Sequence, residues 1–167
     1  MKKFLCAILC LCVCLCASSC ADKSNTAEDI LGGIMNEMSE ISDLPKGKIY
    51  RAGAEEGSED YLSADTATAL YGENAAHHLT LVSDFAIYLS AFAAPCEIAV
   101  FICYSASDAL TIERMCRERA DVLSVAMRES DLCDLKLNAT IVRKGRRVAF
   151  AMTDSAPRAE KIVKKFT

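Results

Sequence analysis

The chain has no tryptophan, and its two histidines, His77 and His78, are adjacent. It contains no G-x-S-x-G, H-E-x-x-H or glycine-rich phosphate-binding motif, the short patterns that accompany large classes of hydrolases and nucleotide-binding enzymes. Neighbouring residues of a strand face opposite sides, so the two histidines would form a poor chelating pair. We therefore predict no catalytic residue, no metal site and no cofactor, and expect a protein that is not an enzyme.

The chain also has fewer basic than acidic residues. The 19 Lys and Arg residues face 23 Asp and Glu residues, and without Lys2 and Lys3 the remaining 17 basic residues leave a formal charge of −6. This balance argues against nucleic acid as a partner. Eight basic residues do gather late in the chain: Arg143, Lys144, Arg146, Arg147, Arg158, Lys161, Lys164 and Lys165. We interpret them as a solvated hairpin turn and helix face, with a surface for anionic lipid or cell-wall polymer as the alternative.

The longest uninterrupted run of apolar residues lies near the start of the chain. Thirteen of them, residues 4–16, follow Lys2 and Lys3, and small residues occupy positions 17–19. A transmembrane helix needs about 20 apolar residues, so this run is short for a permanent span. A positive start, an apolar centre and small residues at the end are the layout of a secretory signal peptide. We predict that residues 1–19 are a signal peptide and that the protein is extracytoplasmic.

Cys20 ends this leader and differs from the five cysteines before it, which we interpret as apolar filler. A cysteine after three small residues resembles the bacterial lipobox, in which the thiol receives the lipid and becomes the first residue of the mature chain. The lipobox usually has Leu where this chain has Ala17, and residues 17–19 also suit ordinary secretory cleavage. We predict lipidation at Cys20 and a membrane anchor, with secretion as the alternative.

Four cysteines follow the leader: Cys96, Cys103, Cys116 and Cys133. Disulfides are permitted outside the cytoplasm, and four cysteines allow three pairings. Cys96 and Cys103 lie on opposite faces of one expected strand, which excludes a bridge between them there. Cys116 falls on the apolar face of an expected helix. We expect reduced thiols that pack as small apolar groups.

The mature chain divides at about residue 62. Residues 20–62 are expected to hold an N-terminal helix, from the helical spacing of apolar residues between Ala27 and Ile41, followed by an exposed acidic loop over residues 46–61. That loop could hold Ca²⁺, but its spacing matches no calcium loop and a solvated loop is the better interpretation. Residues 63–167 are expected to form a single α+β domain.

From about residue 77 the apolar pattern alternates between strand and helix periods. It predicts the order β-β-α-β-β-α, with strands beginning near His77 and at Cys96, a long helix that Ser107 caps, a hairpin that turns at residues 144–145, and a closing helix. A capped helix from Ser63 to Gly72 precedes them. The fold class is α+β, with one mostly antiparallel four-stranded sheet and the helices on one of its faces.

Several short stretches together resemble a known family. They are "ALYG" at 69–72, "CEIAVF" at 96–101, the Arg-rich helix, "ATIVRKGRRVAFAMT" at 139–153 and "AEKIVKKF" at 159–166. Their order and spacing resemble the DUF4358 family of uncharacterised bacterial lipoproteins over residues 70–166. Cys96 before the glutamate and the long acidic loop depart from the usual form. The resemblance implies a fold and a membrane address, and no reaction.

One charged pair stands out from the apolar pattern. Arg119 falls in the middle of the apolar stripe of the long helix, and Glu97 lies on a strand that is otherwise apolar on both faces. Arg119 could extend past the helix edge to water, pair with Glu97 in the core, or wait in a cleft for an anionic ligand.

These observations lead to a hypothesis about function. We expect a lipid-anchored, non-catalytic domain that binds a protein partner or another envelope component. A small-ligand-binding or accessory module of a membrane transporter is the alternative, and an uncharacterised enzyme comes third. A polar pocket would favour the ligand, and an apolar patch on an open sheet face would favour the partner.

Overall fold

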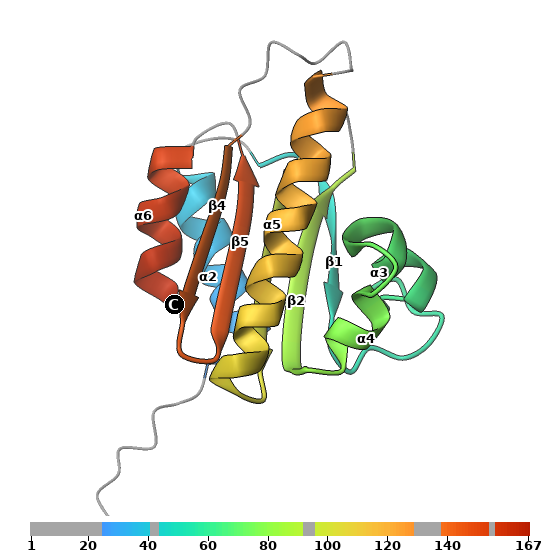
Figure 1. Ribbon diagram of the computed structural model, residues 1–167. Helices are drawn as coiled ribbons and strands as arrows, with labels where there is room; N and C mark the ends of the chain where they lie inside the picture. The colour runs from blue at the N-terminus through green and yellow to red at the C-terminus, as the bar shows by residue number, and fades with distance from the viewer. Residues whose placement is uncertain (1–24, 41–43, 92–95, 129–137, 154–155) are drawn as a thin grey trace, which may run out of the picture.

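A five-stranded antiparallel sheet runs through the protein, and helices pack on both of its faces (Figure 1). The computed structural model describes residues 25–40, 44–91, 96–128, 138–153 and 156–167. The elements of these residues, in chain order, are α2 (Ala27–Ser39), β1 (Gly47–Arg51), α3 (Ala64–Tyr71), α4 (Ala75–Leu79), β2 (Val82–Ser90), β3 (Glu97–Cys103), α5 (Ala106–Arg128), β4 (Asn138–Lys144), β5 (Arg147–Thr153) and α6 (Ala156–Phe166). The α+β class and the antiparallel sheet are therefore confirmed.

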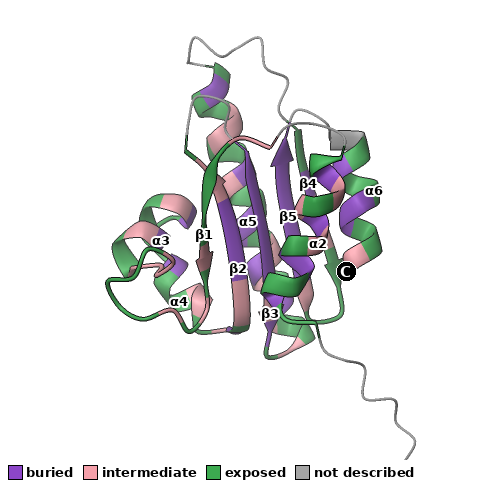
Figure 2. Cartoon of the chain, turned by 180° about the vertical axis from the view of Figure 1, so that it is seen from behind, coloured by how far each residue is buried: buried purple, intermediate pink, exposed green. Residues whose placement is uncertain are grey.

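The strand order is β1-β2-β3-β5-β4, with β3 at the centre. Figure 2 shows β2, β3 and β5 largely buried and the edge strands β1 and β4 more exposed. Glu97, the first residue of β3, lies opposite Leu89 of β2 and Met152 of β5. The start of β3 and the ends of β2 and β5 therefore meet at one end of the sheet.

Each face of the sheet has its own hydrophobic core. Alternate residues of β3 point to opposite faces, so Phe101 packs with α3, α4 and α5, whereas Val100 packs with α2 and α6. Both side chains are fully buried. A strand covered on both faces reads as a continuous apolar run, which explains the sequence of β3.

α2 begins with a capping box and ends packed against α6. The Thr26 hydroxyl accepts a hydrogen bond from the Asp29 N–H, and the Asp29 carboxylate accepts one from the Thr26 N–H. A Cβ added at Gly33 would overlap the ring of Phe166, so the glycine allows α6 to approach the α2 backbone closely. Gly32, one residue earlier, has open space beside it. The two adjacent glycines thus have different roles.

The expectation of four strands was wrong, because a fifth strand lies within the expected acidic loop. β1 covers Gly47–Arg51 and pairs with β2 along its whole length. Only five residues long and mostly exposed, it lacks the apolar alternation that marks a half-buried strand. Gly47 lies against the Leu89 carbonyl and the Tyr88 ring, where a Cβ would not fit.

Three further expectations need correction. The helices cover both faces of the sheet, not one, because β3 and β5 are apolar on both sides. His77 and His78 belong to the short helix α4, and the following strand begins at Val82. The long helix is capped by Ser105 and not by Ser107, because the Ser105 hydroxyl accepts a hydrogen bond from the Asp108 N–H. α3, by contrast, has its cap at Ser63 and its stop at Gly72, as predicted.

Candidate functional site

Glu97 is a charged residue at a buried position. As the first residue of β3 it shares a face with Ala99 and Phe101, and this face packs against α5. Its exposed fraction is 3%. A carboxylate that is removed from water needs hydrogen-bond partners, because its desolvation otherwise costs several kcal/mol.

Two side chains supply these partners, one for each carboxylate oxygen. Arg119 of α5 donates from Nε to Glu97 Oε2 across 2.9 Å, and the Tyr71 hydroxyl of α3 donates to Oε1 across 2.8 Å. The structure thus brings together the two residues that the sequence singled out, and it adds Tyr71. The helical spacing of Ala67 and Tyr71 on α3 was the available signal for this residue, since both are buried.

Burial dominates the electrostatics of the cluster. It raises the pKa of Glu97, while the charge of Arg119 and the hydrogen bonds from Tyr71 and Arg119 act in the opposite direction. Burial, followed by the charge of Glu97, holds the pKa of Tyr71 well above its usual range, so the phenol keeps its proton and remains a donor. The thiol of Cys116 has a strongly raised pKa for the same two reasons.

A pocket of about 270 Å³ opens beside this cluster. We call it the Arg119 pocket, and it lies at the end of the sheet where β2 ends and β3 begins. Its lining residues are Leu70, Leu89, Ser90, Ala91, Cys96, Glu97, Arg119, Leu123 and Met152. Most of the wall is apolar, and its charged groups are the Glu97 carboxylate and the Arg119 guanidinium.

The guanidinium of Arg119 is only partly used. Nε is bound to Glu97, but neither Nη atom has a hydrogen-bond partner among the described residues. In that part of the chain, the one fully buried side-chain polar atom without a partner is His78 Nδ1. The Nη atoms are therefore in contact with solvent, although the side chain as a whole is only 12% exposed. Arg119 lines the pocket, and its guanidinium is a rigid, planar group of hydrogen-bond donors.

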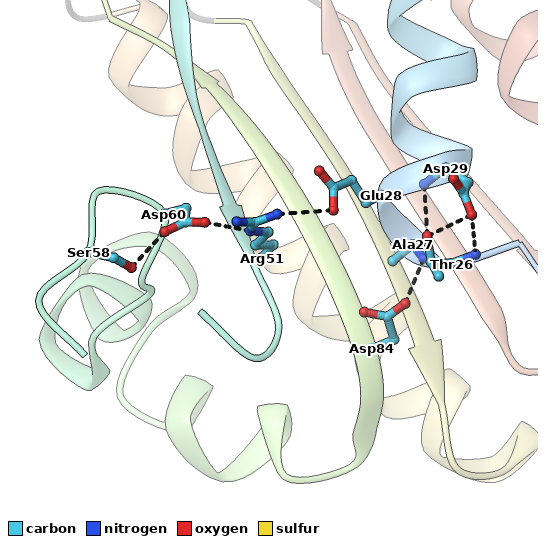
Figure 3. Close-up of polar contacts among 8 residues, drawn as sticks. All are labelled: Thr26, Ala27, Glu28, Asp29, Arg51, Ser58, Asp60 and Asp84. Carbon is cyan, nitrogen blue, oxygen red and sulfur yellow. Dashed lines mark hydrogen bonds and ion pairs between the residues drawn. The ribbon is translucent and has the colours of Figure 1, made fainter. Parts of the chain in front are cut away.

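The other residues considered from sequence do not join this site. Within the described chain no group of three or more His, Cys, Asp or Glu residues is arranged to hold a metal ion. In the acidic loop, Asp60 accepts hydrogen bonds from Arg51 and from Ser58, which fixes the loop to β1 (Figure 3). Cys20 lies outside the described residues, so its lipidation stays a prediction.

The thiols of the described chain are buried. Cys96 belongs to the core beside α2 and α6, and Cys103 and Cys116 belong to the core beside α5. Burial raises the pKa of Cys103 to about 11. Cys96 directly precedes β3 and Cys103 is its last residue, so an odd separation of seven places them on opposite faces of the sheet. Cys133 lies outside the described residues.

Comparisons with protein-family models, curated proteins and solved structures give no match for this chain. The resemblance to the DUF4358 family thus stays a prediction. No helix of the described residues has the length and apolar character that a membrane span requires.

Proposed function

We propose that this chain is an extracytoplasmic binding domain, anchored through Cys20, that takes up a small ligand with an anionic group in the Arg119 pocket. The leader and the small residues before Cys20 support the address and the anchor. The ligand rests on one observation: a buried carboxylate holds Arg119 through Nε, the Nη atoms have no hydrogen-bond partner among the described residues, and Arg119 lines the pocket. This proposal corresponds to the small-ligand-binding alternative that the sequence analysis offered, and it includes no catalytic step.

The way in which Arg119 is held explains why an anion is the expected ligand. Glu97 uses both carboxylate oxygens on Arg119 and Tyr71, so it presents a satisfied group to the pocket. The two Nη atoms form a planar pair of donors that matches a carboxylate or phosphate in bidentate geometry. Because Glu97 fixes the guanidinium before the ligand arrives, little side-chain freedom is lost on binding.

The walls and the volume of the pocket restrict the chemistry and the size of the ligand further. Leu70, Leu89, Leu123 and Met152 provide an apolar surface beside the guanidinium. The volume of about 270 Å³ lies just below the usual range of ligand sites, about 300–1,000 Å³. We therefore favour a small carboxylate with a short apolar body over a large or multiply charged molecule. Such a ligand suits a binding module that serves a membrane transporter.

Thermal unfolding with a panel of small carboxylates and phosphates tests the proposal. A ligand that binds the folded state raises the unfolding midpoint as its concentration rises. Arg119→Lys keeps the charge and loses the planar pair of donors, so we expect about tenfold weaker binding of any hit. Arg114→Lys is the matched control, since Arg114 lies exposed on the same helix. A hit that binds both variants equally well is not held by Arg119, and the proposal then fails.

A protein partner is the second candidate, and an exposed apolar surface on α5 favours it. Val122 and Val125 are 61% and 44% exposed and lie three residues apart, on one side of the helix. Among the described residues both faces of the sheet are covered by helices. Ile49, Tyr104 and Leu110 are exposed as well, but the two valines are neighbours on one helix. If a partner binds there, replacing both valines with serine should abolish its co-purification from native membranes while Arg119→Lys leaves it intact.

A further inference from the structure

The end of the sheet opposite the Arg119 pocket carries a group of basic side chains. Lys144, Arg146 and Arg147 surround the β4–β5 turn and line a hollow of about 570 Å³ together with Asn25 and Thr26. Ser83, at the start of β2, lines the same hollow, whereas Ser90, at the end of β2, lines the Arg119 pocket. Seven residues of strand correspond to roughly 23 Å, so the two hollows lie on opposite ends of the protein. We call Lys144, Arg146 and Arg147 the basic end.

Basic side chains outnumber acidic ones around the hollow, three against Asp84. Among the described residues, Lys144, Arg146 and Arg147 take part in no salt bridge. The acidic side chain that lines the hollow, Asp84, accepts a hydrogen bond from the Ala27 N–H across 2.7 Å and so serves the start of α2. The C-terminal end of α6 lies near the same turn (Figure 1), but its last-turn lysines, Lys164 and Lys165, pair with Glu160 and Glu37.

The segment that joins the predicted anchor to the domain also enters the domain at the basic end. α2 begins at Ala27 and is held there by Asp84, by the capping box and by an exposed ion pair between Glu28 and Arg51 of β1 (Figure 3). Asn25 follows Cys20 by five positions along the chain. Five residues span at most about 18 Å, so a lipid at Cys20 would keep the basic end within that distance of the membrane. The Arg119 pocket would then face away from it.

We propose that the basic end is a docking surface for an anionic lipid bilayer, and that it orients the anchored protein with the Arg119 pocket directed outward. The charges complement anionic headgroups, and the short tether brings them to those headgroups. The proposal uses the anchor at Cys20 and is independent of what the Arg119 pocket binds.

Vesicle binding by the unlipidated mature chain tests the surface apart from the anchor. The protein would comprise residues 20–167 with Cys20→Ser, and the vesicles would be phosphatidylcholine with or without phosphatidylglycerol. Neutralising all three residues of the basic end (Lys144→Gln, Arg146→Gln, Arg147→Gln) should weaken binding to the anionic vesicles on the order of 100-fold, at roughly fivefold per residue. Circular dichroism would establish that each variant is folded.

A second triple variant, Lys46→Gln, Arg114→Gln and Arg128→Gln, is the control. It carries the same net charge but leaves the basic end intact, so we expect binding close to that of the parent chain. Because the mature chain is negatively charged as a whole, binding to anionic vesicles requires a local patch. Equal weakening by both triple variants, or no binding of the parent chain to anionic vesicles, would overturn the proposal.

Hydrogen–deuterium exchange on the vesicle-bound parent chain tests the orientation. Amides of the β4–β5 turn should exchange more slowly in the presence of anionic vesicles, and amides at Ser90 and Ala91 should not change. Slower exchange around the Arg119 pocket, with no change at the turn, would contradict the orientation.

Discussion

Replacing Arg119 with methionine removes the positive charge from a buried pair and retains most of the side chain's volume. At neutral pH the variant leaves the Glu97 carboxylate, 3% exposed, with the Tyr71 hydroxyl as its remaining partner. Breaking a buried ion pair in this way costs about 3–5 kcal/mol of folding free energy when the stranded charge stays ionised. Coulomb's law gives about 4 kcal/mol for unit charges 4 Å apart at an effective dielectric constant of 20.

Protonation of Glu97 limits this cost. A stranded carboxylate can take up a proton, and at 1.36 kcal/mol per pKa unit this costs at most about 3.7 kcal/mol at pH 7 for an ordinary glutamate. The wild-type protein already bears part of the penalty, because burial raises the pKa of Glu97 even beside Arg119. We therefore expect Arg119→Met to lower the free energy of unfolding by about 2–3 kcal/mol at pH 7.

The sign of the pH dependence follows from the same raised pKa. Between the unfolded and folded pKa values of Glu97 the folded state binds more protons than the unfolded state. The contribution of Glu97 to folding stability is therefore complete below the unfolded pKa and is lost as pH rises through the folded pKa. Arg119→Met raises the folded pKa further and extends this loss to higher pH. The cost of the substitution should thus shrink to below about 1 kcal/mol at pH 5.

Urea unfolding of a double-mutant cycle at pH 5 and pH 7 provides the measurement. Glu97→Gln keeps one acceptor oxygen, replaces the other with an NH2 donor and leaves the Arg119 charge unpaired, so alone it should cost about 1–3 kcal/mol. In the double variant it should recover most of the loss caused by Arg119→Met. Arg114→Met is the control and should change stability by less than about 0.5 kcal/mol. A small or pH-independent loss of stability in Arg119→Met would refute the buried-pair argument. It would favour the alternative that the Arg119 side chain extends past the helix edge to water.

Three other predictions concern the anchor, α2 and the thiols. Cys20→Ala should abolish metabolic labelling with a fatty acid while Cys16→Ala retains the label, and equal labelling would exclude lipidation at Cys20. Gly32→Ala should stabilise the protein by about 1 kcal/mol because it removes glycine from an open helix position, whereas Gly33→Ala should destabilise it through overlap with Phe166. If urea unfolding gave stability changes of the same sign for both variants, this would contradict the packing of α2 on α6. Alkylation of a denatured, unreduced chain that begins at residue 21 should modify four thiols, and a count of zero or two would reveal disulfides.

The sequence predicted secondary structure best where the apolar periodicity agrees with the residues that start and end a helix. α3 shows Ser63 at its start and Gly72, with a φ of 87°, at its end, and its boundaries match the expectation. The continuous apolar run of β3 indicated a covered strand. The expectation of helices on one face did not follow from that run, because apolar residues of both parities need cover on both faces.

Short and edge elements were the ones that the sequence did not reveal. β1 is held by pairing with β2 and by close contacts of Gly47, which are tertiary effects without a local pattern. α4 is five residues long, and its apolar positions also fit the alternation of the strand that follows. The charged pair was visible because Arg119 interrupts an apolar stripe, but sequence could not tell that Tyr71 would occupy the other oxygen of Glu97.

Side-chain NMR of Arg119 tests most directly the claim that the Arg119 pocket binds an anion. With the nitrogen resonances of Arg119 assigned through Arg119→Lys, titration of a small carboxylate that raises the unfolding midpoint should shift its Nη signals in a saturable way. The methyl signals of Leu89 and Leu123 should move with the same dissociation constant, because these side chains line the pocket. Saturable shifts elsewhere in the protein, with the Arg119 and leucine signals unchanged, would contradict the proposed function.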